Sequence, residues 1–258
     1  LAAEGIKELI LVAQDSTAYG LDLKGQGDLL ELVRKLAQIE GLYWIRIMYA
    51  YPPRDASLLE AVLQIHKVVP YLDMPIQHGS DRILAAMGRR YNRDDVYRLV
   101  GNLREKVSNL VLRTTLLTGF PGETLEDHEQ NMTMLRELEF DWTGVFAYSK
   151  EDGTVAGQLS SQVDEPTKDQ RRRELLHLQQ KITRKKNRNR IGSPVTVLID
   201  KELNPGTYRG RSFLQAPEVD GNFIVKSDRP LVVGEFVNAV ITRVSGYDLV
   251  GELYVGDT

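Results

Sequence analysis

The chain has 258 residues, 42% of them hydrophobic, which is enough for one large core or for a medium core with a small second domain. Its formal net charge of −3 argues against a globally basic nucleic-acid binder. The absence of cysteine excludes disulfides, thiolate zinc sites and a cysteine nucleophile within this sequence. No apolar run approaches the roughly 20 residues of a membrane span, so we expect a cytoplasmic protein by default.

The first residues lack the basic-then-apolar layout of a secretory signal. Residues 1–5 resemble the end of a helix that is capped by Gly5 and runs into a strand over residues 8–14. We therefore expect the sequence to begin inside an element, as a fragment would.

Strand-like and helix-like segments alternate over the first 150 residues. Alternation of this kind predicts right-handed crossovers and a parallel sheet, which is either closed into a barrel or left open. The apolar, strand-like runs cover residues 9–13, 44–49, 71–76, 110–118 and 143–148, and the amphipathic, helix-like stretches cover residues 28–39, 56–68, 81–87, 94–107 and 125–138.

Unusual polar residues follow directly after the apolar runs. Because chemistry collects at the C-terminal ends of parallel strands, these residues mark one edge of the sheet as the working edge. Neither G-x-G-x-x-G nor G-x-x-x-x-G-K-[ST] is present where an open-sheet nucleotide site needs it, so a partial TIM-like (β/α) barrel is preferred. The polar segments are Gln14 with Asp15, residues 49–52, Gln77 with His78, residues 119–123, and Tyr148 with Ser149.

A long helix is predicted over residues 165–190, and its charges are strongly biased. From Lys168 to Arg190 it carries ten Lys or Arg against only two acidic residues. One interpretation is a solvated helix face that covers the barrel and leads to the next domain. The alternative is a contact with the phosphates of ribosomal or transfer RNA.

After residues 192–194 the pattern changes to short β-type runs separated by turn signals. Closely spaced strands predict a small all-β barrel of the OB type that starts near Ser193. This part carries six Lys or Arg against nine Asp or Glu, so it suits a basic protein partner better than phosphates. The predicted strands cover residues 195–199, 223–225, 236–244 and 249–255.

The segment Gly119-Phe-Pro-Gly-Glu-Thr124 is the most specific motif in the chain. We interpret it as a tight turn in which Gly119 and Gly122 allow close backbone approach to a flat ligand. Thr124 is expected to cap the next helix, with Asp127 in the reciprocal position. A purely structural strand-to-helix turn is the alternative.

The segment Asp73-Met-Pro-Ile-Gln-His-Gly-Ser-Asp-Arg82 is the second motif. Gln77 and His78 are expected to end a strand inside the barrel mouth, and Ser80 fits the N-cap of the following helix. A lone histidine is more often a hydrogen-bonded structural residue than a ligand, so Gln77 is the stronger candidate for a ligand contact. Two weaker segments, residues 13–20 and 145–154, follow the first and last strands of the predicted barrel.

Together, in this order and spacing, the four segments resemble the radical S-adenosylmethionine (SAM) methylthiotransferases. Members of that family run from a Cys-x-x-x-Cys-x-x-Cys motif through a partial (β/α) barrel to a TRAM domain. Residues 13–19 and 112–115 are similar to the RimO type, which modifies a ribosomal protein, and differ from the MiaB type, which modifies transfer RNA. Residues 210–221 resemble the TRAM signature of the RimO type.

The resemblance implies a radical SAM partial barrel with its linking helix over residues 1–192 and a TRAM domain over residues 193–258. In the family, three cysteines bind a [4Fe–4S] cluster that holds SAM, and reductive cleavage of SAM gives a 5′-deoxyadenosyl radical. A second [4Fe–4S] cluster is linked to sulfur delivery, and a second SAM supplies the methyl group. The RimO-type target is the β-carbon of an aspartate in protein S-twelve of the small ribosomal subunit, a basic partner that suits the acidic TRAM domain.

This sequence departs from the family because no cysteine holds either cluster, so the chain alone is predicted to be inactive in the radical step. What the resemblance implies for the rest is a cofactor and substrate cradle. By position, Gln14 and Asp15 face the methionine amino end of SAM. Gln77 and Ser80 approach its ribose. The residues that line the adenine site are Gly119, Phe120, Phe146, Ala147 and Tyr148.

Arg113 is the candidate residue whose ligand is easiest to predict, because a guanidinium pairs bidentately with a carboxylate. That carboxylate belongs either to the cofactor or to the aspartate substrate, and a structural ion pair inside the barrel is the alternative. Two further functions stay open for the chain: the transfer-RNA enzyme of the same family, and a binding module without clusters that acts through its TRAM domain. No catalytic pair supports a cluster-free TIM-barrel enzyme.

Overall fold

The computed structural model describes residues 1–22, 27–52 and 56–254. The chain folds into two compact units. The domain boundary predicted between residues 192 and 193 stays a prediction. The sheet unit consists of Ile10–Gln38 and Ile45–Ile182, and the small-barrel unit consists of Leu1–Leu9, Ile39–Trp44 and Thr183–Thr258.

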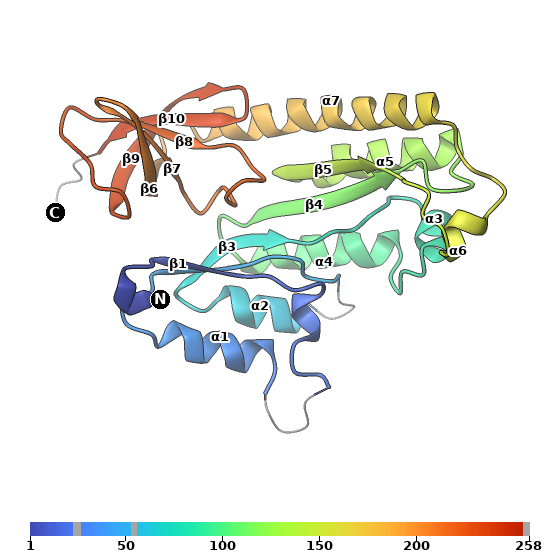
Figure 1. The fold of residues 1–258 in the computed structure, drawn as a ribbon, viewed down its shortest axis with the longest axis horizontal. Helices are drawn as coiled ribbons and strands as arrows, with labels where there is room; N and C mark the ends of the chain where they lie inside the picture. The colour runs from blue at the N-terminus through green and yellow to red at the C-terminus, as the bar shows by residue number, and fades with distance from the viewer. Residues whose placement is uncertain (23–26, 53–55, 255–258) are drawn as a thin grey trace. The chain divides into compact units, whose positions relative to one another are not determined.

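A five-stranded sheet holds its strands in chain order, β1-β2-β3-β4-β5. The pairings of β2 with β3, β3 with β4, and β4 with β5 are parallel, which confirms the predicted α/β class (Figure 1). Parallel strands in chain order, joined by helices, are the arrangement of a TIM-like barrel. The strands are β1 (Glu8–Leu11), β2 (Trp44–Ile47), β3 (Val68–Asp73), β4 (Val111–Thr118) and β5 (Trp142–Ala147).

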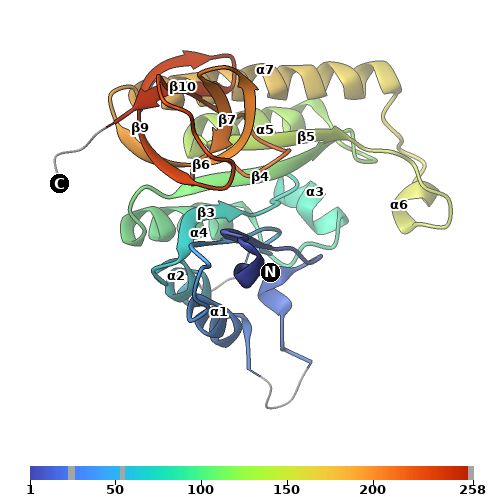
Figure 2. The same ribbon diagram turned by 60° about the vertical axis from the view of Figure 1, so that its left-hand side comes forward.

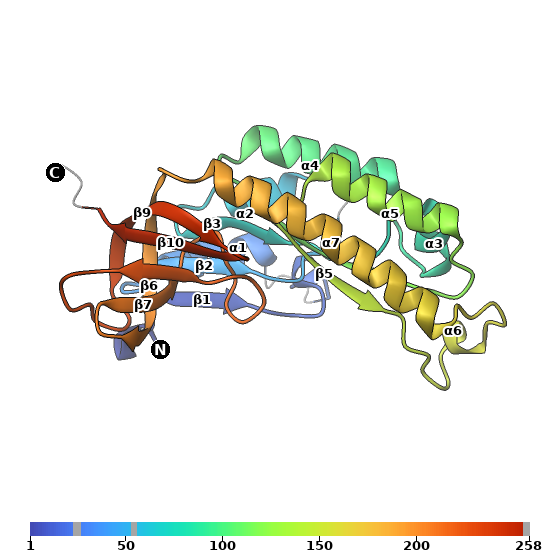
Figure 3. The ribbon, with the colours of Figure 1, turned by 90° about the horizontal axis from the view of Figure 1, so that it is seen from above.

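Helices occupy the connections between the strands, and Figure 3 shows α4, α5 and α7 running side by side. The helix predicted over residues 56–68 ends at Leu63 in the structure. The β-branched Val68 and Val69 belong to β3 instead. No helix among the described residues is both long and apolar enough to cross a membrane. The helices are α1 (Leu29–Ala37), α2 (Ser57–Leu63), α3 (Asp81–Ala86), α4 (Arg93–Lys106), α5 (Leu125–Leu138), α6 (Val155–Gln158) and α7 (Glu165–Asn189), with 3₁₀ turns η1 (Ala2–Glu4) and η2 (Ser16–Ala18).

Reciprocal caps start the two helices on either side of β4. Asn92 accepts a hydrogen bond from the amide of Asp95 at the start of α4, and the Asp95 carboxylate accepts one from the amide of Asn92. Thr124 and Asp127 make the same reciprocal pair at the start of α5, which confirms the predicted capping box. Each cap stabilises its helix by about 1 kcal/mol.

Burial alternates along β4, so the sheet has two unlike faces. Thr114 is fully buried, and its register partner Thr143 donates a hydrogen bond to Gln179 of α7 at 2.8 Å. This face therefore lies under the helices. The opposite face, which we call the inner face, carries the half-buried positions of β4. They are Arg113, Thr115 and Leu117.

The C-terminal strands close into a five-stranded barrel in the order β10-β8-β7-β6-β9 (Figure 2). The barrel confirms the predicted small all-β fold, and alternate apolar side chains such as Val197 and Phe223 fill it. Sequence patterns missed β7, and residue 255 of the last predicted strand lies outside the described residues. The strands are β6 (Pro194–Asn204), β7 (Thr207–Arg211), β8 (Phe223–Lys226), β9 (Phe236–Ser245) and β10 (Asp248–Leu253).

Two early segments belong to the small-barrel unit through specific contacts. The ring of Trp44 packs edge-on against Phe236 of β9, with centroids 4.8 Å apart. The Arg211 guanidinium of β7 donates to the carboxylate of Glu8 at 2.6 Å and also pairs with Asp200. These contacts explain why residues distant in sequence group with the barrel.

A substitution at Gly251 of β10 tests how tightly the small barrel is packed. A Cβ at this position would stand 2.5 Å from the carbonyl oxygen of Val240 and 2.8 Å from the Phe223 ring. We expect Gly251→Ala to lower the free energy of unfolding by about 1–3 kcal/mol, because neither neighbour can withdraw from a closed barrel. Urea denaturation followed by circular dichroism measures this change.

Gly101→Ala is the matched control, because a Cβ at Gly101 in α4 would meet nothing within 4 Å. This substitution should raise stability by roughly 0.5–1 kcal/mol, since alanine is the better helix former. Equal effects of the two substitutions would contradict the packing described for Gly251.

Candidate functional site

Hydrogen bonds join neighbouring segments along the C-terminal edge of the sheet. The amide of Ser16, after β1, donates to the carbonyl of Tyr49, after β2, at 3.0 Å. The amide of Tyr148, after β5, donates to the carbonyl of Thr118 at the end of β4 at 2.8 Å. Side chains that follow these strands therefore lie along one edge, where parallel-sheet enzymes place their sites.

Gln14 and Asp15 follow β1, and their side chains differ in availability. Gln14 is exposed. The carboxylate of Asp15 caps the 3₁₀ turn η2, since it accepts hydrogen bonds from the Thr17 amide at 2.9 Å and from the Thr17 hydroxyl at 2.5 Å. Asp15 thus holds local backbone, and its contact with the amino end of SAM stays a prediction.

Gln77 adopts an unusual backbone conformation at the edge. Its φ of +74° lies in the left-handed region, which a residue with a side chain occupies at a cost of about 1–3 kcal/mol. The backbone is fixed there on both sides, because its amide donates to the Thr115 carbonyl at 2.8 Å and its carbonyl accepts from the Leu117 amide at 2.7 Å. Strained, firmly held positions of this kind cluster at functional sites.

Ser80 has a different role from the one its sequence position suggested. It occupies the N-cap of α3, but its side chain makes no capping bond. The buried hydroxyl donates to the carboxylate of Asp127 at 2.6 Å instead, and the Ser80 amide donates to Nδ1 of His78 at 2.9 Å. His78 is fully buried, as the structural interpretation of a lone histidine predicts. The Ser80 hydroxyl thus has a partner within the protein, and its contact with the ribose of SAM stays a prediction.

Glu123 is the centre of the buried polar network beneath the edge. Its Oε2 accepts from the Gly119 amide at 2.6 Å and lies 3.3 Å from Nε2 of His78. Its Oε1 accepts from the Thr118 hydroxyl at 3.1 Å and from the Arg171 guanidinium of α7 at 2.9 Å. One carboxylate therefore fixes the end of β4, the following turn, the second motif and the long helix.

The environment keeps the Glu123 carboxylate ionised. Burial raises its pKa, but the hydrogen bond from His78 and the positive charge of Arg171 outweigh burial, so the pKa lies below the ordinary 4.5. In the sequence, Glu123 is predicted only to belong to the turn over residues 119–124. No spacing or periodicity in the sequence distinguishes it from an exposed one.

Gly119 is required by protein packing. Its φ is +74°, and a Cβ there would stand 2.3 Å from Cγ of Lys168 in α7. The aliphatic stem of Lys168 thus occupies the space where a Cβ would stand, and the approach of a flat ligand to this turn stays a prediction. Gly119 lets α7 pack close to the turn.

Phe120 and Tyr148 form a small buried cluster with Ile83 of α3. The two aromatic rings pack edge to face with centroids 5.5 Å apart, and only 5% of Phe120 and 9% of Tyr148 is exposed. The two rings are therefore largely buried, and their contact with adenine stays a prediction. Ala147 is half-buried, and Phe146 differs from all of these because 59% of it is exposed.

Arg113 forms an ion pair on the inner face. Its Nη1 lies 3.0 Å from Oδ1 of Asp73, the register partner on β3, and Asp73 is fully buried. Burial raises the pKa of Asp73 above its ordinary value, although Arg113 and the Tyr49 amide act in the opposite direction. The ion pair that was considered as the structural alternative is present. The Arg113 side chain as a whole retains 11% exposure.

Gly144 of β5 creates a junction of three different groups on the inner face. The position of a Cβ at Gly144 would be 3.4 Å from Nη2 of Arg113, 3.4 Å from the Phe146 ring and 3.7 Å from the Thr115 hydroxyl. Thr115 is the register partner of Gly144, so all these groups share one face. A cation, a hydroxyl and an exposed aromatic ring at one point suit a ligand with a flat ring and a carboxylate.

Sequence reasoning named Arg113 and Phe146 but missed Asp73, Thr115 and Gly144. A usable signal exists for Gly144, since a glycine inside a strand often marks the close approach of another group. The other two residues resemble ordinary strand positions.

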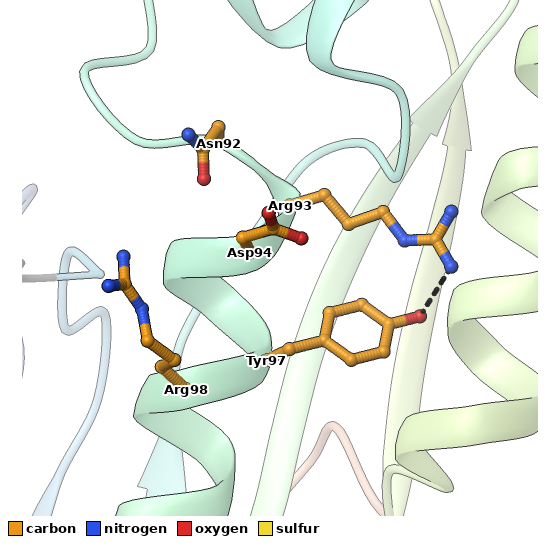
Figure 4. A pocket seen from close by; sticks show the side chains of 5 residues that line it. All are labelled: Asn92, Arg93, Asp94, Tyr97 and Arg98. Atoms are coloured by element: carbon orange, nitrogen blue, oxygen red, sulfur yellow. Dashed lines mark hydrogen bonds between the residues drawn. The ribbon is translucent and has the colours of Figure 1, made fainter.

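A separate hollow of about 590 Å³ lies on the outer helix α4 (Figure 4). Figure 4 shows Arg93 turned toward Tyr97, whose hydroxyl accepts a hydrogen bond from it at 3.0 Å. The hollow contains none of the predicted site residues. It is lined by Asn92, Arg93, Asp94, Tyr97 and Arg98.

The resemblance implies two kinds of cofactor, iron–sulfur clusters and SAM, and the residues of this chain suit them to different degrees. The sequence has no cysteine, and the described residues contain no group of three or more His, Cys, Asp or Glu that could hold a metal ion. An iron–sulfur cluster therefore finds no ligands here. At the Gly144 junction, the exposed Phe146 ring is of the type that stacks on a base, and the Arg113 guanidinium is of the type that pairs with a carboxylate; SAM carries both groups.

Glu123→Gln should destabilise the sheet unit by about 3 kcal/mol at neutral pH, because it leaves the Arg171 guanidinium without a buried counter-charge. Since the folded pKa of Glu123 lies below 4.5, its stabilisation is complete above pH 4.5 and is lost as the pH falls toward the lowered value. The difference in stability between wild type and variant should therefore shrink below pH 4.5. Urea denaturation over this pH range measures it.

Glu129→Gln is the control, because Glu129 is an exposed residue of α5. Its effect should stay within about 0.5 kcal/mol. A Glu123→Gln variant as stable as this control would show that the buried carboxylate does not hold the edge together.

Two family models match the chain. Residues 1–135 match the radical SAM superfamily, and residues 191–253 match the TRAM domain. Among solved structures, coproporphyrinogen III oxidase (HemN) from Escherichia coli gives a TM-score of 0.48 at 18% identity, covering 60% of this chain and 36% of that one.

Curated relatives match nearly the whole chain. It is 44% identical over 255 residues to the ribosomal protein uS12 methylthiotransferase RimO of Acetivibrio thermocellus, which is 98% of this chain and 56% of the relative. It is 43% identical over 249 residues to the protein of the same name from Syntrophomonas wolfei, which is 96% of this chain and 57% of the relative. The chain thus spans a little over half the length of these relatives, and their names confirm the resemblance to the RimO type. Because the superfamily model covers more than half of its residues, this chain belongs to the radical SAM superfamily.

Proposed function

We propose that this chain is part of a ribosomal protein methylthiotransferase, which adds a methylthio group to the β-carbon of an aspartate in ribosomal protein uS12. The similarity to RimO enzymes over 98% of the chain supports this choice. A second support is the sequence at residues 13–19 and 112–115, which differs from the pattern of the transfer-RNA enzymes.

The observation that carries the proposal is the junction over Gly144. There the Arg113 guanidinium, the Thr115 hydroxyl and the exposed Phe146 ring converge within 3.7 Å of one point on the inner face. We assign Phe146 to the adenine ring, because bases stack on aromatic side chains with about 1–3 kcal/mol each. When bound beside a reduced cluster, SAM would supply the species that removes a hydrogen atom, and a second SAM would supply the methyl group.

Arg113 holds a carboxylate in this proposal. Its ion pair with Asp73, 3.0 Å long, fixes the guanidinium before any ligand arrives, so little side-chain entropy remains to be lost. SAM and the aspartate substrate both carry a carboxylate, and Arg113 serves one of them.

The other predicted residues divide into contacts and supports. Gln14, Gln77 and Ala147 stand at the edge with exposed or half-buried side chains, and we propose them as ligand contacts. Asp15 holds the backbone amide of Thr17, and the Ser80 hydroxyl holds the side-chain carboxylate of Asp127. The supporting residues beneath the surface are Gly119, Phe120 and Tyr148.

The iron–sulfur clusters must be held by cysteines outside this sequence, because the chain contains none. We therefore propose that the chain alone does not perform the radical step. In the complete enzyme, residues 1–192 form the radical SAM barrel and residues 193–258 form the TRAM domain. We further propose a cytoplasmic enzyme whose acidic TRAM domain meets the basic uS12, since six Lys or Arg stand against nine Asp or Glu from Ser193 onward.

Phe146→Ala should weaken the binding of S-adenosylhomocysteine to this chain by about tenfold or more, because it removes the stacking surface for adenine. Isothermal titration calorimetry measures the affinity. Val155→Ala removes a side chain that is 82% exposed on α6 and serves as the control. The same affinity in both variants would remove Phe146 from the adenine site.

The substrate is tested with a protein that joins this chain to a cluster-binding part, with its clusters rebuilt under anaerobic conditions. It is offered SAM, a sulfur source, and either uS12 or transfer RNA. We expect mass spectrometry to find one added methylthio group on an aspartate of uS12. Modification of transfer RNA alone would reject the ribosomal-protein assignment in favour of the related RNA enzyme.

A further inference from the structure

The helix α7 concentrates positive charge in a chain that is acidic overall. Its 25 residues include nine Lys or Arg and three Asp or Glu, whereas the whole chain carries a net charge of −3. All three acidic residues lie in its first ten positions. The part of the helix from Leu175 onward is therefore basic without compensation along its own length.

Five basic side chains of α7 form one row, which we call the basic stripe: Arg173, His177, Lys181, Arg184 and Arg188. Their spacings are four, four, three and four residues, so they share one face of the helix. All five are exposed. The opposite face is buried, and Gln179 on it accepts from Thr143 and donates to the Phe140 carbonyl, both at 2.8 Å. Packing of that face turns the stripe to solvent.

Few of the basic side chains in the stripe form an ion pair within the described part of the chain. Arg173 lies 3.3 Å from the carboxylate of Asp169. In the part of the chain that the structure describes, no ion pair involves Lys181, Arg184 or Arg188. Repulsion along such a row weakens a helix, so the charges favour a ligand that neutralises several of them at once.

We propose that the basic stripe binds the phosphate backbone of RNA without reading its sequence. No large apolar side chain of α7 is exposed within the described residues, whereas both a membrane surface and a protein partner usually add apolar contacts. A row of arginines and lysines without apolar neighbours suits phosphates. The proposal stands on the helix alone. If the proposed function holds, ribosomal RNA around uS12 is the RNA that the stripe meets.

The test uses this chain and a fluorescently labelled RNA hairpin of arbitrary sequence, with binding followed by anisotropy at several salt concentrations. The stripe variant combines Lys181→Gln, Arg184→Gln and Arg188→Gln, which preserves helix propensity. The control combines Arg34→Gln, Lys35→Gln and Arg136→Gln, three exposed helix cations outside the stripe, with the same loss of charge.

We expect the stripe variant to bind the hairpin at least about tenfold more weakly near 0.1 M salt, with a salt dependence reduced by roughly 2–3 in slope, while the control stays within about twofold of wild type. Equal losses in both variants would overturn the proposal, because net charge alone would then explain binding. Loss of binding to anionic vesicles or to polyglutamate, with RNA binding intact, would overturn it in favour of another partner. Because no cluster or methylthio transfer is involved, failure here leaves the proposed function untouched.

Discussion

The buried carboxylate of Glu123 is the constraint on which the working edge depends. It joins the Gly119 amide, the Thr118 hydroxyl, His78 and Arg171, which come from the turn after β4, the strand itself, the second motif and α7. A buried charge persists only when hydrogen bonds and a counter-charge replace water, and here both are present. The two most specific motifs of the sequence thus share one structural centre beneath the site.

On the inner face of the sheet, Gly144 marks the point where side chains of β4 and β5 meet. The missing side chain lets Arg113 of β4 approach Phe146 and Thr115, and Asp73 of β3 holds the guanidinium from the other side. Groups that are positioned before binding lose little entropy when a ligand arrives. The polar network therefore supports the edge, and we propose that the groups around Gly144 recognise the ligand.

Much of the fold was predictable because strand and helix periods, caps and turn signals are local properties. The capping box of Thr124 and Asp127, the parallel sheet and the small barrel follow from such patterns. The site was predictable only in outline, since the motifs mark the correct edge. Gly119 is required by α7, the partner of Ser80 lies in α5, and Tyr148 packs on Ile83 of α3; each of these helices is distant in sequence from the residue that it contacts. Local patterns cannot show which helix will cover a turn.

We propose that the inner face at Gly144, and not the hollow on α4, receives SAM. A crystal structure of this chain grown with S-adenosylhomocysteine tests it most directly. The account predicts the adenine ring stacked on Phe146 and the carboxylate in reach of either Arg113 or the Gln14 edge. Ligand density among Asn92, Tyr97 and Arg98, with Phe146 left uncovered, would contradict it.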